Sequence, residues 1–413
     1  MKNKRRFRSS ILGAAIAGAI AVACGAGSGS DSTAAPVPTP TPVAPAATAV
    51  DTAPETPAQT VPGPRPIVEP DADYRAKVND ANLRTVAFDE ILSGGVPRDG
   101  IPPLDDPKFV SIEDADLWLE DLQPVISFKV NNEARAYPLA ILTWHEVVND
   151  VVGGVSVTVT FCPLCNSAMV FDRMLEGRVF DFGVSGNLRN CDLIMWDRQT
   201  QSCWQQLTGE GIVGELAGHQ LEFLPASIIS WGDYKQANPD TLVLSRDTGF
   251  SRPYSGYDWA DQPAFLFDGR PDERLLPKER VAAFNIGDVS AAFPFLVLGQ
   301  ERVVNYNVNN TDIVVFFKPG TVSALDRRLI IDSRDIGSSG VFEAELDGRK
   351  LTFRADEDNA FVDNETGTTW NILGQALAGP LSGQSLMPIV HGDHFWFAWG
   401  AFNPDTRIYS GQG

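Results

Sequence analysis

Val125 to Pro163 reads VISFKVNNEARAYPLAILTWHEVVNDVVGGVSVTVTFCP, and a divergent copy of this stretch occurs later in the chain. The copy occupies residues 281–319, VAAFNIGDVSAAFPFLVLGQERVVNYNVNNTDIVVFFKP, and aligns without a gap at a constant offset. The similarity resumes downstream, where the matched residues are Asp197 with Asp363, Trp204 with Trp370, and Asn238 to Thr241 with Asn403 to Thr406. Two such matches indicate an internal duplication, so we expect two tandem homologous lobes related by a pseudo-twofold axis.

Each copy has the residue pattern of β-hairpins. In the first copy, Asn131-Asn132 separates two apolar runs, and asparagine tolerates the positive φ of a tight turn. Gly153-Gly154 separates a second pair of runs. The returning run, Val155 to Phe161, alternates apolar residues with serine and threonine, which predicts a strand with one buried face. We expect short helices at Leu139 to Thr143 and at Trp231 to Gln236, and therefore a β-rich α+β fold.

The N-terminal residues are typical of an export signal. Lys2, Lys4, Arg5, Arg6 and Arg8 precede a short apolar run from Ile11 to Ala23, which is too short to span a bilayer. The run ends in Ala21-Val22-Ala23-Cys24, which is similar to the lipobox of bacterial lipoproteins, where the cysteine is lipidated. We therefore predict a signal peptide over residues 1–23 and a membrane anchor on Cys24, which places the protein in the cell envelope, outside the cytoplasm.

The composition divides the rest of the chain into five segments. Residues 24–70 are rich in Pro, Ala and Thr and predict a disordered tether. Residues 71–124 are expected to be a mostly irregular lead-in, 125–245 the first lobe, 246–280 a connector, and 281–413 a second, degenerate lobe. With 33 basic and 53 acidic residues the formal net charge is −20, which argues against nucleic-acid binding. The sequence does not identify a small-molecule or protein partner.

The first lobe carries polar residues that the second copy lacks. The second copy has Lys318-Pro319-Gly320-Thr321 in place of Cys162-Pro163-Leu164-Cys165, and Glu301 in place of His145. Because both copies are expected to fold, these thiols and this imidazole are candidates for a functional site. Pairing of the hairpin around Gly153-Gly154 would place His145, at the start of the opposing strand, opposite residues 160–162.

Two thiolates and an imidazole can bind copper(I) or, with a fourth ligand, zinc(II). We therefore predict a copper or zinc ion held by Cys162, Cys165 and His145, with Glu146 orienting or tuning the site from outside the ligand set. Two alternatives remain open. The same residues suit a thiol enzyme, in which one cysteine is the nucleophile or redox partner and His145 the base. A non-catalytic, ligand-binding lipoprotein with structural disulfides is the other.

The remaining polar clusters favour structural interpretations. Cys191 and Cys203 flank the expected hairpin turn at Asp197-Arg198-Gln199-Thr200 and are predicted to form a cross-strand disulfide or to remain free thiols. His391 and His394 with Asp393 invite a metal interpretation, but a polar loop before the aromatic segment Phe395-Trp396-Phe397 accounts for them more simply.

The ordered set of motifs resembles the bacterial domain of unknown function 3179 family. The residues that carry the resemblance are Ile91 to Gly95, Asp99 to Pro102, Ala136 to Leu139, Trp144 to Asp150, Phe161 to Cys165, Phe182 to Gly186, Asp197 to Thr200 and Phe395 to Trp399. Members of this family resemble one another in the His-Glu and Cys-Pro-x-Cys segments. The resemblance therefore implies that these two segments form a site common to the family. Serine and an apolar residue are more typical of the family at the positions of Cys191 and Cys203. The resemblance implies no particular activity.

Overall fold

The computed structural model describes residues 83–249, 254–356 and 359–411. The predicted signal peptide, the predicted lipidation site Cys24 and the predicted tether lie outside these residues. No helix within the described ranges has the length and apolar character needed to cross a membrane.

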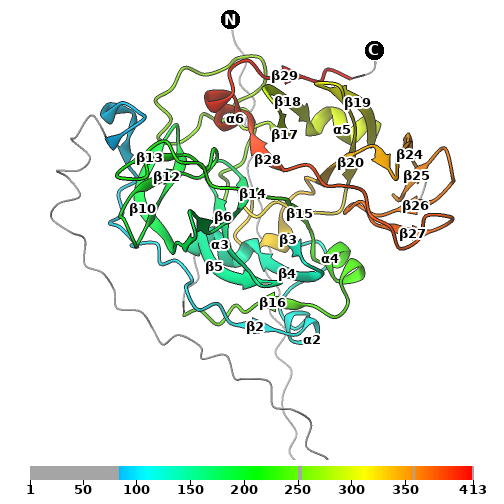
Figure 1. The fold of residues 1–413 in the computed structure, drawn as a ribbon, viewed down its shortest axis with the longest axis horizontal. Coiled ribbons are helices and arrows are strands. Elements are labelled where there is room, and N and C mark those ends of the chain that lie inside the picture. The colour runs from blue at the N-terminus through cyan, green and yellow to red at the C-terminus, as the bar shows by residue number, and fades with distance from the viewer. Residues whose placement is uncertain (1–82, 250–253, 357–358, 412–413) are drawn as a thin grey trace, which may run out of the picture. The chain divides into compact units, whose positions relative to one another are not determined.

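β-Strands dominate the fold, and the helices are short (Figure 1). The elements before the first repeated segment are η2 Phe88–Glu90, β1 Leu92–Ser93, β2 Phe109–Val110 and α2 Ile112–Ala115. The first half of the fold then contains β3 Pro124–Val130, β4 Glu133–Pro138, α3 Leu139–His145, β5 Val147–Val152, β6 Val155–Cys162, β7 Ser167–Asp172, β8 Met174–Leu175, β9 Arg178–Val179, β10 Phe182–Arg189, β11 Asp192–Asp197, β12 Cys203–Gln205, β13 Gly211–Val213, β14 Phe223–Leu224, β15 Ala226–Ser230, α4 Trp231–Ala237 and β16 Leu242–Leu244.

The second half begins at the end of the predicted connector. Its elements are β17 Arg280–Ile286, β18 Val289–Pro294, α5 Phe295–Glu301, β19 Val303–Val308, β20 Thr311–Lys318, η3 Ile330–Asp332, β21 Ser338–Glu343, β22 Glu345–Leu346, β23 Arg349–Lys350, β24 Phe353–Ala355, β25 Phe361–Asp363, β26 Thr369–Trp370, β27 Ala376–Ala378, β28 His391–Phe395, α6 Trp396–Phe402 and β29 Arg407–Ile408.

The two halves place their strands in sheets of similar order. In the first half, β15-β3-β4-β16 lie in one sheet, whose edge is β2, and β5-β6-β7 lie in another, whose edge is β14. A third sheet contains β10-β11-β12-β13, with β1 at its edge. In the second half, the corresponding orders are β28-β17-β18-β29, β19-β20-β21 and β24-β25-β26-β27. The pairing of β16 with β4 is parallel, and so is the pairing of β29 with β18.

A short helix follows the first hairpin in each half and ends in the same unusual way. The residue that follows α3 is Glu146, whose φ is +58°, and the residue that follows α5 is Arg302, whose φ is +66°. The amide of each of these residues donates to the carbonyl four residues earlier, and its carbonyl accepts from the amide of Phe161 in β6 or of Phe317 in β20. Because a left-handed backbone at a non-glycine residue is costly, its occurrence in both halves indicates an architectural requirement of this corner.

Strand β28 of the second half packs against the first half. It pairs with β17 within its own sheet and contacts β7 and β15, and β15 in turn contacts β21 (Figure 1). The largest hydrophobic core correspondingly contains Phe161 and Trp204 together with Phe395 and Trp396. The turn between β6 and β7 is therefore enclosed by side chains from both halves of the chain.

The predicted hairpins and helices agree with the structure in most positions. Val147 pairs with Thr160 and Val152 with Val155, which confirms the hairpin predicted at Gly153-Gly154. The helices expected near Leu139 and Trp231 are α3 and α4. The prediction that a strand starts at His145 is wrong, because His145 is the last residue of α3.

Candidate metal centre

The turn between β6 and β7 holds the two cysteines of the Cys-Pro-Leu-Cys segment. Cys162 is the last residue of β6 and pairs with Ser167, the first residue of β7. The amide of Cys165 donates to the Cys162 carbonyl at 3.2 Å, and Asn166 takes a positive φ of 51° to start the return strand. The side chains of both cysteines are buried and free. The turn thus holds two reduced thiols close together inside the core.

Asp192 completes a three-residue group with these thiols. It is the first residue of β11, and the ligand atoms of Cys162, Cys165 and Asp192 all lie within 4.8 Å of one another. In tetrahedral zinc sites with Zn–S distances near 2.3 Å, neighbouring ligand atoms are about 3.8 Å apart. A shift of roughly an ångström or less per side chain would therefore bring the three atoms into one coordination sphere.

The Asp192 carboxylate is only half satisfied by protein hydrogen bonds. Its Oδ2 accepts from Gln205 Nε2 at 2.6 Å and from the Leu207 amide at 2.9 Å. Its Oδ1 is buried and has no hydrogen-bond partner among the described residues. Burial raises the pKa of Asp192 to about 6, although these hydrogen bonds and one with Cys165 oppose the shift. One oxygen of a buried acid therefore remains available to a ligand beside the thiols.

Both thiols are held in their neutral form. Burial raises the pKa of Cys162 to about 11 and the pKa of Cys165 well above its ordinary value. The Asp192 and Glu146 carboxylates add to the shift of Cys162. Because the thiolate is the reactive species, these cysteines are poor nucleophiles at neutral pH in the absence of a cation.

The backbone carbonyl of Cys191 faces the thiols. It accepts from Cys165 Sγ at 3.3 Å and, more weakly, from Cys162 Sγ at 3.9 Å. The Cys191 backbone has a positive φ of 65°, which turns the chain into β11. Its own thiol donates to the Phe265 carbonyl at 2.6 Å. The Cys191 backbone therefore positions Asp192 and offers a carbonyl oxygen to the two thiols. The thiol of Cys191 is hydrogen-bonded to the connector instead.

The connector and the second half enclose this turn. Tyr257 donates its hydroxyl to the Leu164 carbonyl at 3.0 Å, and burial together with the nearby thiols raises the Tyr257 pKa. From β28, the Phe395 amide donates to the Cys165 carbonyl at 2.9 Å. Asn166 Nδ2 donates to the Asp393 carbonyl at 2.5 Å. The position of the turn thus depends on residues more than two hundred positions away in the sequence.

Comparison with known protein families places this turn within a family domain. Residues 98–406 match the model of a family described as protein of unknown function, DUF3179. The chain belongs to the DUF3179 family. The comparisons with curated proteins and with solved structures found no match. The matched range includes Cys162, Cys165 and Asp192, so the buried group lies inside the DUF3179 domain.

His145 lies in the DUF3179 domain but outside the Cys162–Cys165–Asp192 group. Its Nδ1 is 2.7 Å from the Pro102 carbonyl, and its Nε2 is 2.9 Å from Thr248 Oγ1. Since a carbonyl only accepts, Nδ1 carries the proton, and in the neutral ring Nε2 accepts from the threonine hydroxyl. Burial lowers the pKa of His145, which favours this neutral form. Because α3 directs the residue to these partners, the imidazole is not brought into the thiol group.

Cys191 and Cys203 are both free thiols, which is one of the two alternatives predicted for them. Cys203 is the first residue of β12 and pairs with Trp196 near the end of β11, whereas Cys191 precedes the start of β11. The two residues therefore stand near opposite ends of this hairpin. Cys203 packs with Ile194, Ile212 and Val213 in a small hydrophobic cluster.

The histidines near the end of the DUF3179 domain lie in a strand, where a polar loop was expected. His391, Asp393 and His394 belong to β28 and are buried. Ser339 Oγ donates to Asp393, whose pKa is raised by burial to about 7. His394 stacks on Trp399, and burial lowers its pKa to about 3. These residues pack between the halves and do not converge on one point as metal ligands would.

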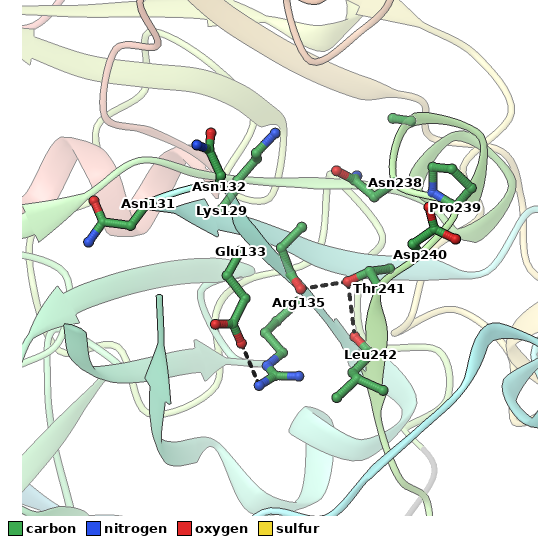
Figure 2. A pocket seen from close by; sticks show the side chains of 12 residues that line it. Lys129, Asn131, Asn132, Glu133, Arg135, Asn238, Pro239, Asp240, Thr241 and Leu242 are labelled. Atoms are coloured by element: carbon green, nitrogen blue, oxygen red, sulfur yellow. Dashed lines mark hydrogen bonds and ion pairs between the residues drawn. The ribbon is translucent and has the colours of Figure 1, made fainter. Parts of the chain in front are cut away.

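A hollow of about 500 Å³ lies on the first half of the DUF3179 domain, between the β3–β4 turn and the loop after α4 (Figure 2). Its polar side chains form ion pairs and hydrogen bonds within the lining. Arg135 forms an ion pair with Glu133 at 2.6 Å, and Thr241 Oγ1 donates to the backbone carbonyl of Ala134 at 2.5 Å. The residues that line it include no cysteine or histidine, so the hollow is separate from the thiol group.

Asp192 is the site residue that the sequence reasoning missed. It stands at the start of an apolar run, Leu193 to Trp196, that forms a buried strand. A charged residue adjoining a fully buried strand is a signal that could have drawn attention to it. Its distance along the chain from Cys162 and Cys165 concealed the relationship.

Proposed function

We propose that the protein binds a transition-metal ion, foremost zinc, through Cys162, Cys165 and Asp192. The observation that carries the proposal is a buried carboxylate with one oxygen lacking a hydrogen-bond partner among the described residues, next to two buried free thiols. A buried polar atom without a partner is costly, and a bound cation would remove that cost.

The charge balance supports a divalent ion. None of the three residues forms an ion pair with a Lys, Arg or His side chain in the described part of the chain. When all three ligands are deprotonated they carry three negative charges, of which a divalent cation offsets two. Sulfur ligands suit copper(I) as well, but a carboxylate is a hard ligand and favours zinc(II) over copper(I). A bound zinc ion would supply a Lewis acid or a structural crosslink, depending on whether a fourth position stays open.

Redox chemistry of the same thiols is the second candidate function. Two free thiols at Cys-x-x-Cys spacing can form a disulfide with the release of two electrons and two protons, and the neighbouring Asp192 carboxylate is a suitable proton acceptor. The burial of both sulfurs opposes this function, because a protein or small-molecule oxidant needs access to a thiolate. Metal binding therefore ranks first.

The decisive experiment is elemental analysis of the purified full-length protein, with a thiol count on the same sample. We expect about one zinc per chain in the wild type and none in Cys162→Ser, Cys165→Ser or Asp192→Asn. Cys203→Ser is the matched control, because it alters a buried free cysteine outside the group.

Cobalt(II) substitution provides a second readout, because thiolate ligands give an intense charge-transfer absorption. Failure of the reduced protein to bind zinc or cobalt would contradict the proposal. A mass two daltons below that of the reduced chain, with Cys162 and Cys165 linked, would favour the redox function.

We further propose that the protein is a lipid-anchored envelope protein, attached through Cys24. The support comes from the sequence alone: a basic start, a short apolar run and a lipobox-like Ala21-Val22-Ala23-Cys24. Metabolic labelling with a radioactive fatty acid should mark the wild type and leave Cys24→Ser unlabelled. Incorporation of equal label into both proteins would contradict the anchor.

We also propose that the two halves arose by duplication and are related by a pseudo-twofold axis. The gapless alignment supports this, as does the matching order of sheets and the shared left-handed corner at Glu146 and Arg302. In the second half, Lys318 occupies the position that corresponds to Cys162, and it forms an ion pair with Asp233 of the first half. On this proposal the second half has replaced the thiol site by an ion pair.

A further inference from the structure

A second hollow of about 500 Å³ lies in the second half of the fold, next to α5 and the end of β20. Much of its lining is apolar, contributed by Phe295, Leu296, Phe317, Pro319 and Ile336. Leu296 is 65% exposed at its edge, so part of the apolar lining is open to solvent. The volume is within the range typical of pockets that bind small organic molecules.

One wall of this pocket carries buried positive charge. Arg280 Nη2 donates to Asp258 Oδ2 at 2.6 Å, and Arg334 Nη2 lies 2.9 Å from Asp258 Oδ1. Asp258 is therefore shared between two guanidinium groups. Lys278 also lines the pocket and is 3% exposed, but its Nζ donates to the Tyr257 carbonyl at 2.7 Å and lies 3.7 Å from the centre of the Tyr257 ring.

A donor on this wall lacks an acceptor in the described part of the chain, although three carboxylates, Asp258, Glu279 and Asp335, lie among the lining cations. Arg280 is 7% exposed, and its Nε has no hydrogen-bond partner among the described residues. Asp335 also lines the pocket, but it is engaged by the amides of Gly320, Thr321 and Gly337. A buried guanidinium N–H without a partner is a position where an anionic ligand gains a charge-assisted hydrogen bond.

We propose that this pocket binds a small organic anion with an apolar body, such as an aromatic or aliphatic carboxylate or sulfonate. The apolar lining takes the body of the ligand, and the wall formed by Arg280 and Arg334 takes its anionic group. The pocket does not include the thiols or Asp192, so this inference stands independently of the proposed metal centre.

Gly299 gives a direct steric test. It lies in α5 and lines the pocket, and a Cβ added there would meet Phe317 Cε1 at 3.7 Å, an ordinary contact. Gly299→Leu should therefore fold while its side chain occupies pocket volume. Because leucine is a better helix former than glycine, loss of the helix is not the expected cause of any defect.

The exposed edge residue gives an electrostatic test. Leu296→Asp and Leu296→Asn differ by one negative charge and are nearly equal in shape. Leu117, which is 81% exposed and lies outside the pocket, provides the control variant Leu117→Asp. The probes are 1-anilinonaphthalene-8-sulfonate and N-phenyl-1-naphthylamine, which share the same rings but differ in the sulfonate. Binding to the full-length protein is followed by fluorescence under native conditions.

We expect saturable binding of the sulfonate probe, weakened about tenfold or more by Gly299→Leu. Leu296→Asp should bind this probe several-fold more weakly than Leu296→Asn, while the two variants bind the neutral probe equally. Leu117→Asp should match the wild type. The proposal is overturned if the sulfonate probe does not saturate, if Gly299→Leu binds it normally, or if both probes respond alike to the added charge. A Cys162→Ser protein that loses metal but keeps probe binding would separate this pocket from the metal centre.

Discussion

Asp197 and Asp363 accept the same hydrogen bonds at corresponding turns of the two halves. Each carboxylate accepts from the amide and hydroxyl of a threonine three residues later and from the indole of a tryptophan seven residues later. The amide distances are 2.6 Å for both Thr200 and Thr366, and the indole distances are 2.9 Å for both Trp204 and Trp370. The conserved pattern ties each turn to a buried tryptophan.

The two carboxyls nevertheless differ in pKa. Burial raises the pKa of Asp197, and its hydrogen bonds do not fully offset that shift. Burial acts on Asp363 in the same direction, but the hydrogen bonds from Trp370 and Thr366 outweigh it and lower the pKa. The charge is therefore better stabilised at Asp363 than at Asp197.

Replacing either aspartate with asparagine should destabilise the fold, and Asp363→Asn should cost more. Each change turns an amide donor toward partners that are themselves donors, which costs on the order of 1–3 kcal/mol. The loss is smaller for Asp197→Asn because removing its charge also removes a burial cost. Urea unfolding at neutral pH measures both values. Equal stability of the wild type and both variants would contradict the assigned role.

The metal-free protein should lose stability through Asp192 as the pH rises toward and past 6. Its folded pKa of about 6 exceeds the ordinary value of 3.8, so the folded state holds a proton that the unfolded state releases. That stability is present at lower pH and is lost as the pH rises through about 6, by on the order of 1 kcal/mol between pH 5 and pH 7.5.

Asp192→Asn supplies the comparison for this pH effect, because asparagine keeps the shape and cannot titrate. The free energy of unfolding of the wild type should fall relative to that of the variant between pH 5 and pH 7.5. Parallel curves would show that Asp192 is ionised throughout. With zinc bound, the trend should reverse, because the metal needs the carboxylate and the thiolates and binds more tightly as protons leave.

His145→Ala should weaken the fold and leave the metal content unchanged. The variant leaves the Pro102 carbonyl and the Thr248 hydroxyl without their partner and opens a cavity, at a cost of about 2–4 kcal/mol. Thermal unfolding and elemental analysis on the same preparation test both parts. A stable protein without metal would instead identify His145 as a ligand.

Reducing agent should not change the melting temperature, because the four cysteines in the described ranges are free. Cys203→Ala should cost about 1 kcal/mol through lost packing against Ile194, Ile212 and Val213. Peptide mapping under non-reducing conditions provides the check. A recovered peptide pair linking Cys191 to Cys203 would contradict the structure of this hairpin.

Much of the fold was predictable because its signals are local. The Asn131-Asn132 and Gly153-Gly154 turns fix the hairpins. The alternation from Val155 to Phe161 predicted a strand there, but the expected single buried face is wrong, because Thr158 and Thr160 are as buried as Val157 and Val159. The corner after α3 was not predictable in this way. A glutamate with positive φ has no local sequence signal, so His145 was expected in a strand and was found at the end of a helix.

The candidate site was predictable only in part. Cys162 and Cys165 lie in one turn, and their spacing identifies them. Asp192 joins them because β10 and β11 fold back beside that turn, a contact between separate hairpins. Tertiary packing of this kind depends on the whole core and leaves no periodic pattern in the sequence.

The hydrogen bond from the Phe395 amide to the Cys165 carbonyl has a consequence for the order of events during biosynthesis. Translation proceeds from the N-terminus, so the thiols exist long before β28 does. Until that strand docks, the turn lacks both its Phe395 and its Asp393 contacts, and its sulfurs remain open to oxidants and to chelators. Sealing of the thiol pair is thus one of the last steps of maturation, and a premature stop codon shortly before residue 391 would leave the pair permanently exposed.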